Sequence, residues 1–167
     1  WDAFRASVEQ CRERLARTPA ADIWVVEAGK KGPFAESSRI PGSTREMLAV
    51  LDGVTSAGSI TYQSVETVHN GRKLRLYVVG YEPGRIGGPQ TVGEGRPIFR
   101  SHYEMVADGR CGLSLGERVH LGRETCTVVG LTTGQVSSSG DPVVYLSLKD
   151  SQDLQFEPEP AVARREA

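Results

Sequence analysis

Apolar residues recur at helical spacing near the start of the chain. Within residues 2–17 they stand three or four positions apart, with arginine and glutamate among the residues between them: Phe4, Val8, Cys11 and Leu15. This spacing predicts an amphipathic helix. Thr18-Pro19 is expected to end it, because the residue before a proline is driven out of the helical conformation.

A second, shorter helix is predicted to begin near Ser43. Ser43 and Glu46 have the spacing of a capping box, in which the Ser43 hydroxyl accepts a hydrogen bond from the Glu46 amide and the Glu46 carboxylate reaches back. Gly53 is expected to end this helix as a left-handed residue. Its inner face is predicted to consist of Met47, Leu48 and Leu51.

Short runs of β-branched and aromatic residues predict strands in the first half of the chain. Residues 22–29 are expected to form a buried strand. Two longer runs, 59–68 and 72–80, are joined by Asn70-Gly71, the dipeptide that best accepts positive φ in a two-residue turn. They therefore predict a β-hairpin, whose core-facing residues would be Leu74, Leu76 and Val78.

The second half of the chain predicts another hairpin. Its arms are residues 118–121 and 124–131, and residues 143–146 and 148–156 predict a further strand and a helix. Residues 81–97 contain five glycines and three prolines, which predicts a long loop. A short helical pattern follows at residues 102–108.

Together these elements predict an α+β fold. We expect a mixed β-sheet with two or three helices, plus a small β-rich lobe at about residues 111–147. A length of 167 residues fits one domain, which we assign to residues 1–157. Residues 158–167 combine proline and charge and are expected to form a frayed tail.

Composition and charge narrow the classes of function. Twenty Lys and Arg against 21 Asp and Glu give a net charge of -1, so nucleic acid is not expected as a partner. No apolar run approaches the roughly 18 residues that span a bilayer, and no signal peptide pattern is present. Because the chain begins at Trp1 without a methionine, we expect it to be a piece of a longer protein.

The three cysteines do not form a recognisable framework. Cys11, Cys111 and Cys126 are an odd number at unrelated spacings, which excludes a complete set of disulfides and leaves a zinc site short of thiolates. Cys11 lies on the predicted helical stripe and Cys126 within a predicted strand. Both are therefore expected to be buried apolar residues.

No motif indicates catalysis, and we expect no catalytic, cofactor-binding or metal-binding residues. Ser114 lies in a G-x-S-x-G pattern, but a nucleophile elbow needs a strand before the serine and a helix after it, whereas here a strand is predicted to follow. A turn is the expected role of this segment. The histidines lack any two-ligand spacing: His69 and His120 are expected to be solvated, and a role for His102 beside a carboxylate stays open.

The segments described above resemble, in their order along the chain, the extracytoplasmic core domain of MacB-type and DevC-type ABC transporter permeases. The stretches that carry the resemblance are residues 21–29, 77–83, 87–89, 93–97 and 113–153. Residues 145–156, read as YLSLKDSQDLQF, are similar to the pattern of the DevC-like branch. No single stretch is as specific as a metal signature, and the order carries the resemblance.

This resemblance implies a non-enzymatic domain between the first and second transmembrane helices of a permease. The domain would lie on the periplasmic or extracytoplasmic side of the inner (plasma) membrane, and a separate ATPase subunit would hydrolyse ATP. The permease is expected to be a dimer and to engage a periplasmic adaptor of the membrane-fusion type. The expected function is to bind that adaptor or the substrate and to transmit ATP-driven movement.

The loop at residues 81–97 is the expected contact region for a partner, because it combines length, glycine and arginine. The candidate contact residues are Arg85, Ile86, Gly87, Gly88 and Arg96. Two other functions stay open: a periplasmic sensor that binds a small ligand in an enclosed apolar pocket, and a secreted serine hydrolase that uses Ser114 or His102.

Overall fold

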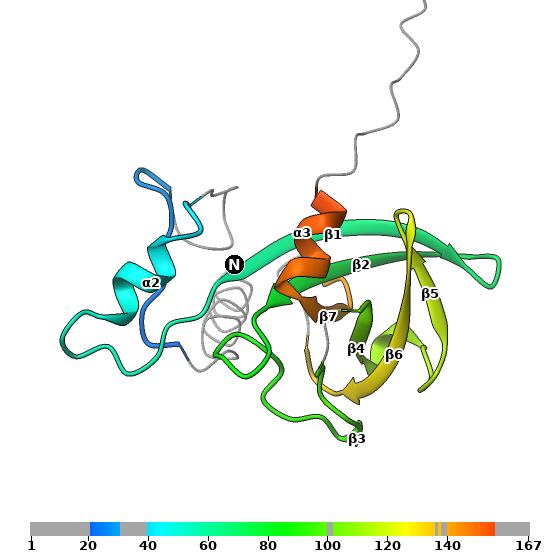
Figure 1. The fold of residues 1–167 in the computed structure, drawn as a ribbon. Coiled ribbons are helices and arrows are strands. Elements are labelled where there is room, and N and C mark those ends of the chain that lie inside the picture. The colour runs from blue at the N-terminus through cyan, green and yellow to red at the C-terminus, as the bar shows by residue number, and fades with distance from the viewer. Residues whose placement is uncertain (1–20, 31–39, 100–101, 136, 138–139, 156–167) are drawn as a thin grey trace, which may run out of the picture.

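The computed structural model describes residues 21–30, 40–99, 102–135, 137 and 140–155. Within these residues the strands form one mixed β-sheet with a few short helices (Figure 1). The helices are α2 (Thr44–Ala49), the 3-10 helix η1 (Gly109–Cys111) and α3 (Leu148–Gln155). The strands are β1 (Ile60–His69), β2 (Arg72–Tyr81), β3 (Glu94–Gly95), β4 (Glu104–Asp108), β5 (Arg118–Leu121), β6 (Glu124–Thr132) and β7 (Val143–Ser147).

The order of strands across the sheet is β1-β2-β7-β4-β6-β3, and β5 also pairs with β6. Two of the pairings, β2 with β7 and β4 with β6, are parallel, while the others are antiparallel. A mixed sheet with few helices is the fold class that the sequence predicts, and that prediction is confirmed.

Both predicted hairpins form. Asn70 and Gly71 have φ values of 50° and 73°, which are the left-handed values that a tight two-residue turn requires. Their turn aligns β1 with β2 so that His69 pairs with Arg72 and Ile60 with Tyr81. The β5–β6 hairpin turns at Gly122, also with positive φ. The turn chemistry therefore sets the register in both cases.

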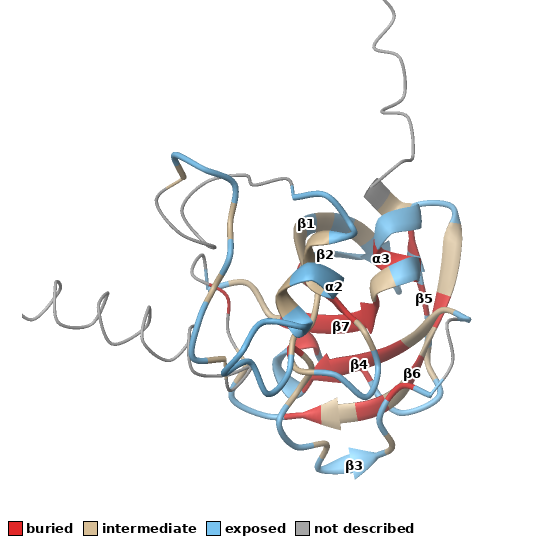
Figure 2. Ribbon diagram, turned by 60° about the vertical axis from the view of Figure 1, so that its left-hand side comes forward, coloured by how far each residue is buried: buried red, intermediate tan, exposed pale blue. Residues whose placement is uncertain are grey.

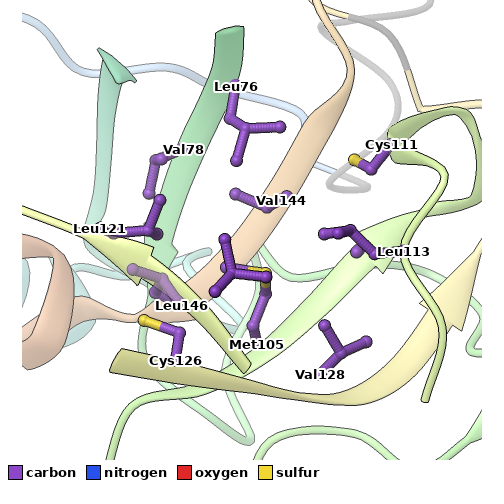
Figure 3. Close-up of a cluster of buried hydrophobic side chains, with 12 residues drawn as sticks. Leu76, Val78, Met105, Cys111, Leu113, Leu121, Cys126, Val128, Val144 and Leu146 are labelled. Carbon is purple, nitrogen blue, oxygen red and sulfur yellow. The ribbon is translucent and has the colours of Figure 1, made fainter. Parts of the chain in front are cut away.

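One face of the sheet carries the main apolar core. Its side chains come from β2, β4, β5, β6 and β7, from η1 and from the turn that follows η1, and they point toward one another (Figure 3). Burying each large aliphatic side chain stabilises the fold by roughly 1.5–3 kcal/mol. The core consists of Leu76, Val78, Met105, Ala107, Cys111, Leu113, Val119, Leu121, Cys126, Val128, Val144 and Leu146. Strands β4 and β7 are buried along most of their length, whereas β6 alternates between buried and half-buried residues (Figure 2).

Helix α3 packs on the edge of this face at a point where β2 has no side chain. Ser151 is fully buried, and its Oγ lies 2.8 Å from Thr61 Oγ1 on β1. The Gln63 amide nitrogen donates to the backbone oxygen of Ser151 at 2.9 Å. A Cβ added at Gly80 would stand only 2.4 Å from the Ser151 Cβ, so glycine is what permits this close approach.

Aromatic side chains line the opposite face. The rings of Tyr62 and Tyr77 stack with their centroids 5.6 Å apart, and Trp24 lies 6.5 Å from Tyr62. Tyr81 and Tyr145 meet edge to face at 6.1 Å. Burial raises the pKa of Tyr77 to about 12, so this layer is uncharged at neutral pH.

Two predictions of secondary structure are wrong. Residues 22–29 form no strand, because they pair with none of the described strands. Ile23 is 79% exposed, while Trp24 lies against Tyr62 on β1. Residues 104–108 form β4 rather than a helix, since pairing with both β6 and β7 outweighs a weak local helical pattern. The corresponding side chains of Met105 and Val106 are fully buried.

Helix α2 begins where the sequence predicts but lacks the predicted cap and inner face. Ser43 adopts helical φ and ψ and its side chain makes no capping hydrogen bond. Met47 is 67% exposed and Leu51 54% exposed, and no residue of α2 is buried. The helix ends at Ala49, before the left-handed Gly53, so the capping box and the core-facing stripe are both incorrect.

Some predictions concern residues that the structure does not describe. The helix at residues 2–17 and the tail at 158–167 lie outside the described residues. The division into a domain at 1–157 and a β-rich lobe at 111–147 stays a prediction. The strands β5, β6 and β7 of that lobe belong to the common sheet.

Candidate functional site

The candidate site is the loop at residues 81–97, which we call the contact loop; it connects β2 to β4 and contains β3. At its start, Glu82 accepts a hydrogen bond from the Ser59 amide at 3.2 Å. The same carboxylate oxygen lies 3.2 Å from Arg45 Nε on α2 and 3.8 Å from Arg85 Nε. Arg85, a predicted contact residue, is thus held beside Glu82 with 45% of its side chain exposed.

The predicted contact glycines pack against the sheet. Gly87 has a φ of +118°, and a Cβ there would lie 2.5 Å from Ile60 Cδ1. A Cβ at Gly88 would lie 2.5 Å from the ring of Tyr81. These two glycines let the loop approach β1 and β2 closely. Ile86, between them and Arg85, is half-buried.

The far end of the contact loop is fixed by Arg96. Its guanidinium binds the Glu104 carboxylate through two hydrogen bonds, of 2.6 and 3.0 Å. The hydrogen bonds that Arg96 donates to Glu104 raise the pKa of Arg96 above its ordinary value. Arg96 also donates to the Pro97 oxygen and lies 5.1 Å from the centroid of the Phe99 ring. The charge that the sequence suggests for a partner is therefore largely directed at Glu104.

Between these two ends, β3 fastens the loop to β6. Glu94 pairs with Leu131 and Gly95 with Gly130. A Cβ at Gly130 would lie 2.4 Å from the Arg96 oxygen, so the loop backbone crosses β6 closely at this point. Three anchors, on α2, β6 and β4, thus hold the contact loop. The side chain of Arg85 is exposed within the loop, and Phe99 is exposed two residues after its end.

Ser114 does not occupy a nucleophile elbow. It follows the 3-10 helix η1 and precedes β5, and its amide donates to Glu117 Oε1 at 3.3 Å. Gly112 and Gly116 on either side have left-handed φ, as the turn interpretation requires. The hydroxyl is therefore not raised between a strand and a helix.

The three histidines lie in separate places. His120 is exposed and its Nδ1 lies 3.0 Å from Thr125 Oγ1, while His102 is exposed in the turn before β4. His69 differs from the prediction of a solvated side chain. Its Nε2 donates to Glu117 Oε2 at 2.7 Å, an ion pair that joins the tip of the β1–β2 hairpin to the turn before β5.

A small pocket lies beside this ion pair. Its volume is about 70 Å³, below the several hundred Å³ typical of small-molecule sites. Charged and polar groups contribute to its walls, so it does not match the enclosed apolar pocket that a sensor predicts. It is lined by His69, Asn70, Arg72, Leu74, Cys111, Gly112, Leu113 and Glu117. Among the described residues no cluster of His, Cys, Asp and Glu is suited to a metal ion.

Two buried carboxylates escaped the sequence analysis. Asp108 accepts hydrogen bonds from the amides of Arg110 and Gln135, at 2.9 and 2.8 Å. Asp150, on α3, accepts from the Tyr103 amide at 2.9 Å. The only sequence signal is the Ser-x-x-Asp spacing of residues 147–150, in which Ser147 Oγ caps the Asp150 amide at 3.2 Å.

Comparisons with known proteins agree with this picture. An uncharacterised ABC transporter permease of Mycobacterium tuberculosis is 29% identical over 142 residues, which are 84% of this chain and 40% of that protein. One of Mycobacterium bovis is 24% identical over 151 residues, 90% of this chain and 43% of that protein. The chain thus spans about 40% of the length of these relatives. No family model matches it.

Solved structures share its fold. The extracellular domain of the ABC-type transporter YknZ from Gram-positive bacteria matches with a TM-score of 0.57 and 15% identity, over 68% of this chain and 65% of that one. The periplasmic region of MacB from Actinobacillus actinomycetemcomitans matches with a TM-score of 0.50 and 17% identity. The match covers 66% of this chain and 56% of that one. The chain thus resembles ABC transporter permeases in sequence and the extracytoplasmic domains of MacB-type transporters in fold.

This similarity agrees with the predicted family and with the predicted extracytoplasmic location. It does not single out the DevC-like branch, which stays a prediction. Among the described residues, no helix is long and apolar enough to cross a membrane. The comparisons assign no role to the contact loop, so the five contact residues stay a prediction as well.

Proposed function

We propose that this domain binds a periplasmic adaptor, the exported substrate or both, and passes ATP-driven movement of a permease to them. The observation that supports this most is the shared fold with the extracytoplasmic parts of two ABC transporters, combined with similarity to permeases along 84% of the chain. A separate ATPase subunit supplies the energy, and the permease works as a dimer of the DevC-like branch.

Movement is transmitted as a population shift. A nucleotide-dependent change in the transmembrane part favours one position of the domain, and the partner binds that position more tightly than the other. The domain must therefore behave as a rigid body with a defined contact surface. The single sheet supplies the rigidity, and the contact loop, held at three points, supplies the surface.

Arg85 is the charged side chain of the contact loop best placed for a partner. It is 45% exposed and meets Glu82 only at 3.8 Å, so its guanidinium has donors available for an additional carboxylate. A partner with an acidic surface is favoured by this arrangement. Arg96 instead serves the loop itself, through Glu104.

A photo-crosslinking experiment in intact cells tests the proposal. A photoreactive amino acid replaces Arg85 in the complete permease, and a matched variant carries it at Arg118, an exposed arginine on β5. We expect a covalent adduct with a periplasmic adaptor, identified by mass spectrometry, from position 85 and not from position 118. Equal adducts from both positions, or none from either, would contradict the contact assignment.

A second test removes residues 87–93 from the complete permease. Adaptor binding and ATP-dependent export are both expected to be lost. Because Gly87 and Gly88 pack against the sheet, the unfolding transition of the variant must be measured beside the wild type. Binding and export that persist in a folded deletion variant would show that the contact loop is not the partner surface.

A further inference from the structure

The end of the contact loop and the residues just after it are ordered by one carboxylate. Phe99 is 70% exposed, and its amide donates to Glu104 Oε2 at 3.0 Å. The ring of Phe99 lies over the guanidinium of Arg96, which binds both oxygens of the same Glu104. We call Arg96 and Phe99 the Phe99 corner. Its position depends on where β4 places Glu104.

The residue before Glu104 has an unusual backbone conformation. Tyr103 has a φ of +55°, in the left-handed region that side chains with a Cβ rarely adopt. Its amide donates to Asp150 Oδ2 at 2.9 Å, and its oxygen accepts from the Thr127 amide at 2.8 Å. A strained residue persists only where its surroundings hold it, and here the two holders are α3 and β6.

The holder on α3 is well placed to respond to movement of that helix. Asp150 is 2% exposed and lies in the first turn of α3, where the Asp150 amide donates to Ser147 Oγ. Besides Asp150, α3 is linked to its surroundings by hydrogen bonds between Ser151 and both Thr61 and Gln63. The Tyr103 hydroxyl also donates to Asp153 Oδ2 on α3, at 3.4 Å. A displacement of α3 by about 1 Å would lengthen this 2.9 Å hydrogen bond beyond its normal range. Such a displacement therefore releases the Tyr103 amide.

We propose that α3 controls the order of the Phe99 corner through Tyr103. While Asp150 holds the Tyr103 amide, Tyr103 stays left-handed and Glu104 is directed at Arg96 and at the Phe99 amide. When α3 shifts, Tyr103 relaxes to an extended conformation, Glu104 turns away and the corner is freed. Tyr103 is thus the two-state element that α3 and the corner both bias. The functional meaning of this coupling rests on the proposed role of the contact loop.

Hydrogen exchange of the Phe99 amide in the 167-residue chain tests the coupling, because that amide is bonded to Glu104. Asp150→Ala removes the acceptor of Tyr103. We expect Phe99 exchange to rise about tenfold, as for the loss of one hydrogen bond of roughly 1.4 kcal/mol. The matched control is Ser147→Ala, which removes the cap of the Asp150 amide but keeps the carboxylate that accepts from the Tyr103 amide. It should raise Phe99 exchange less than about twofold on the same scale.

Two further variants keep the test decisive. Asp150→Asn retains an acceptor oxygen and the volume of the side chain, so it covers the case in which Asp150→Ala fails to fold. We expect Asp150→Asn to raise Phe99 exchange less than Asp150→Ala does. Coupling is also reciprocal. Glu104→Gln is therefore expected to raise exchange of the Tyr103 amide, which is bonded to Asp150.

The proposal is overturned if Phe99 exchange is unchanged in both Asp150 variants, or if Ser147→Ala raises it as much as Asp150→Ala. It is also overturned if Glu104→Gln leaves Tyr103 exchange unchanged. These results are independent of adaptor binding. Loss of the coupling would leave the crosslink from position 85 intact, whereas a missing crosslink would leave the exchange results unaffected, so the two proposals fail separately.

Discussion

The close approach of α3 to β2 predicts a large effect for a very small substitution, Gly80→Ala. A Cβ at this position would lie 2.3 Å from Thr61 Oγ1, 2.4 Å from Ser151 Cβ and 2.7 Å from Ser151 Oγ. The Thr61 hydroxyl can rotate away, but the Ser151 Cβ is fixed to the helix. Since carbon atoms pack at about 3.5–4.0 Å, α3 must move outward by on the order of 1 Å.

The expected loss of stability can be worked from competing terms. Overpacking a close contact costs about 1–3 kcal/mol. The hydrogen bonds that Ser151 makes with Thr61 and Gln63 weaken as well, each contributing about 0.5–1.5 kcal/mol. Against this, alanine is favoured over glycine within a strand by about 0.5–1 kcal/mol, and Gly80 has no positive φ to preserve. A net loss of about 2 kcal/mol follows.

Equilibrium unfolding in urea, followed by circular dichroism, measures this loss. Gly42→Ala is the matched control, because a Cβ at Gly42 meets nothing within 4 Å and its φ is not positive. It should change the unfolding free energy by less than about 0.5 kcal/mol. In the double variant Gly80→Ala/Ser151→Gly, the combined loss should be smaller than the sum of the single losses, because the clashing Cβ is gone.

The result that refutes this reasoning is simple. If Gly80→Ala is as stable as Gly42→Ala, or more stable than the wild type, then α3 does not lie against β2 as closely as described. Additive losses in the double variant would place the cost of Gly80→Ala somewhere other than the Ser151 contact.

Two further predictions concern titratable groups. The hydrogen bond from His69 holds the pKa of Glu117 below its ordinary value of 4.5, so the pair stabilises the fold above about pH 4.5 and loses its effect as the pH falls below it. Urea unfolding between pH 6 and pH 3 should show the difference between wild type and Glu117→Gln shrinking with falling pH, and a constant difference would argue against the pair. Burial raises the pKa of Cys111 and Cys126 to about 12; in a Cys11→Ser background we therefore expect no alkylation by iodoacetamide at pH 7.5 until urea unfolds the chain, and rapid alkylation under native conditions would contradict this.

Local chemistry explains which parts of the fold the sequence predicts well. Asn70 and Gly71 adopt positive φ at little cost, and this alone fixes the turn and the register of β1 and β2. The helix after β7 is signalled by its own spacing and by the cap at Ser147. Elements of this kind depend on residues close together in the chain, so their patterns are visible without a structure.

Elements that depend on distant partners were predicted poorly. Residues 104–108 become a strand because β6 and β7 flank them, and no local pattern shows this. Residues 22–29 have strong strand propensity but pair with no strand in the part of the chain that the structure describes. The apolar stripe of α2, with Met47 and Leu51, suggests burial that the described part of the molecule does not provide.

The candidate site shows the same division. The loop itself is evident from its glycines and prolines, whereas the pairing of Arg96 with Glu104 and of Asp150 with Tyr103 is not. Sequence alone assigns Arg96 to a partner, because a carboxylate eight residues away in an irregular segment carries no recognisable spacing. A left-handed tyrosine is equally invisible, since it is imposed by α3 from 47 residues away.

The most direct test of the central claim is a distance measurement in the complete permease. A spin label at Lys149, an exposed position on α3, reports the separation of the two domains in a permease dimer reconstituted with its ATPase. We predict that the distance distribution shifts when a nucleotide that traps the ATP-bound state is added, and returns when it is removed. Identical distributions with and without nucleotide, in a transporter that still hydrolyses ATP, would contradict a role for this domain in transmitting ATP-driven movement.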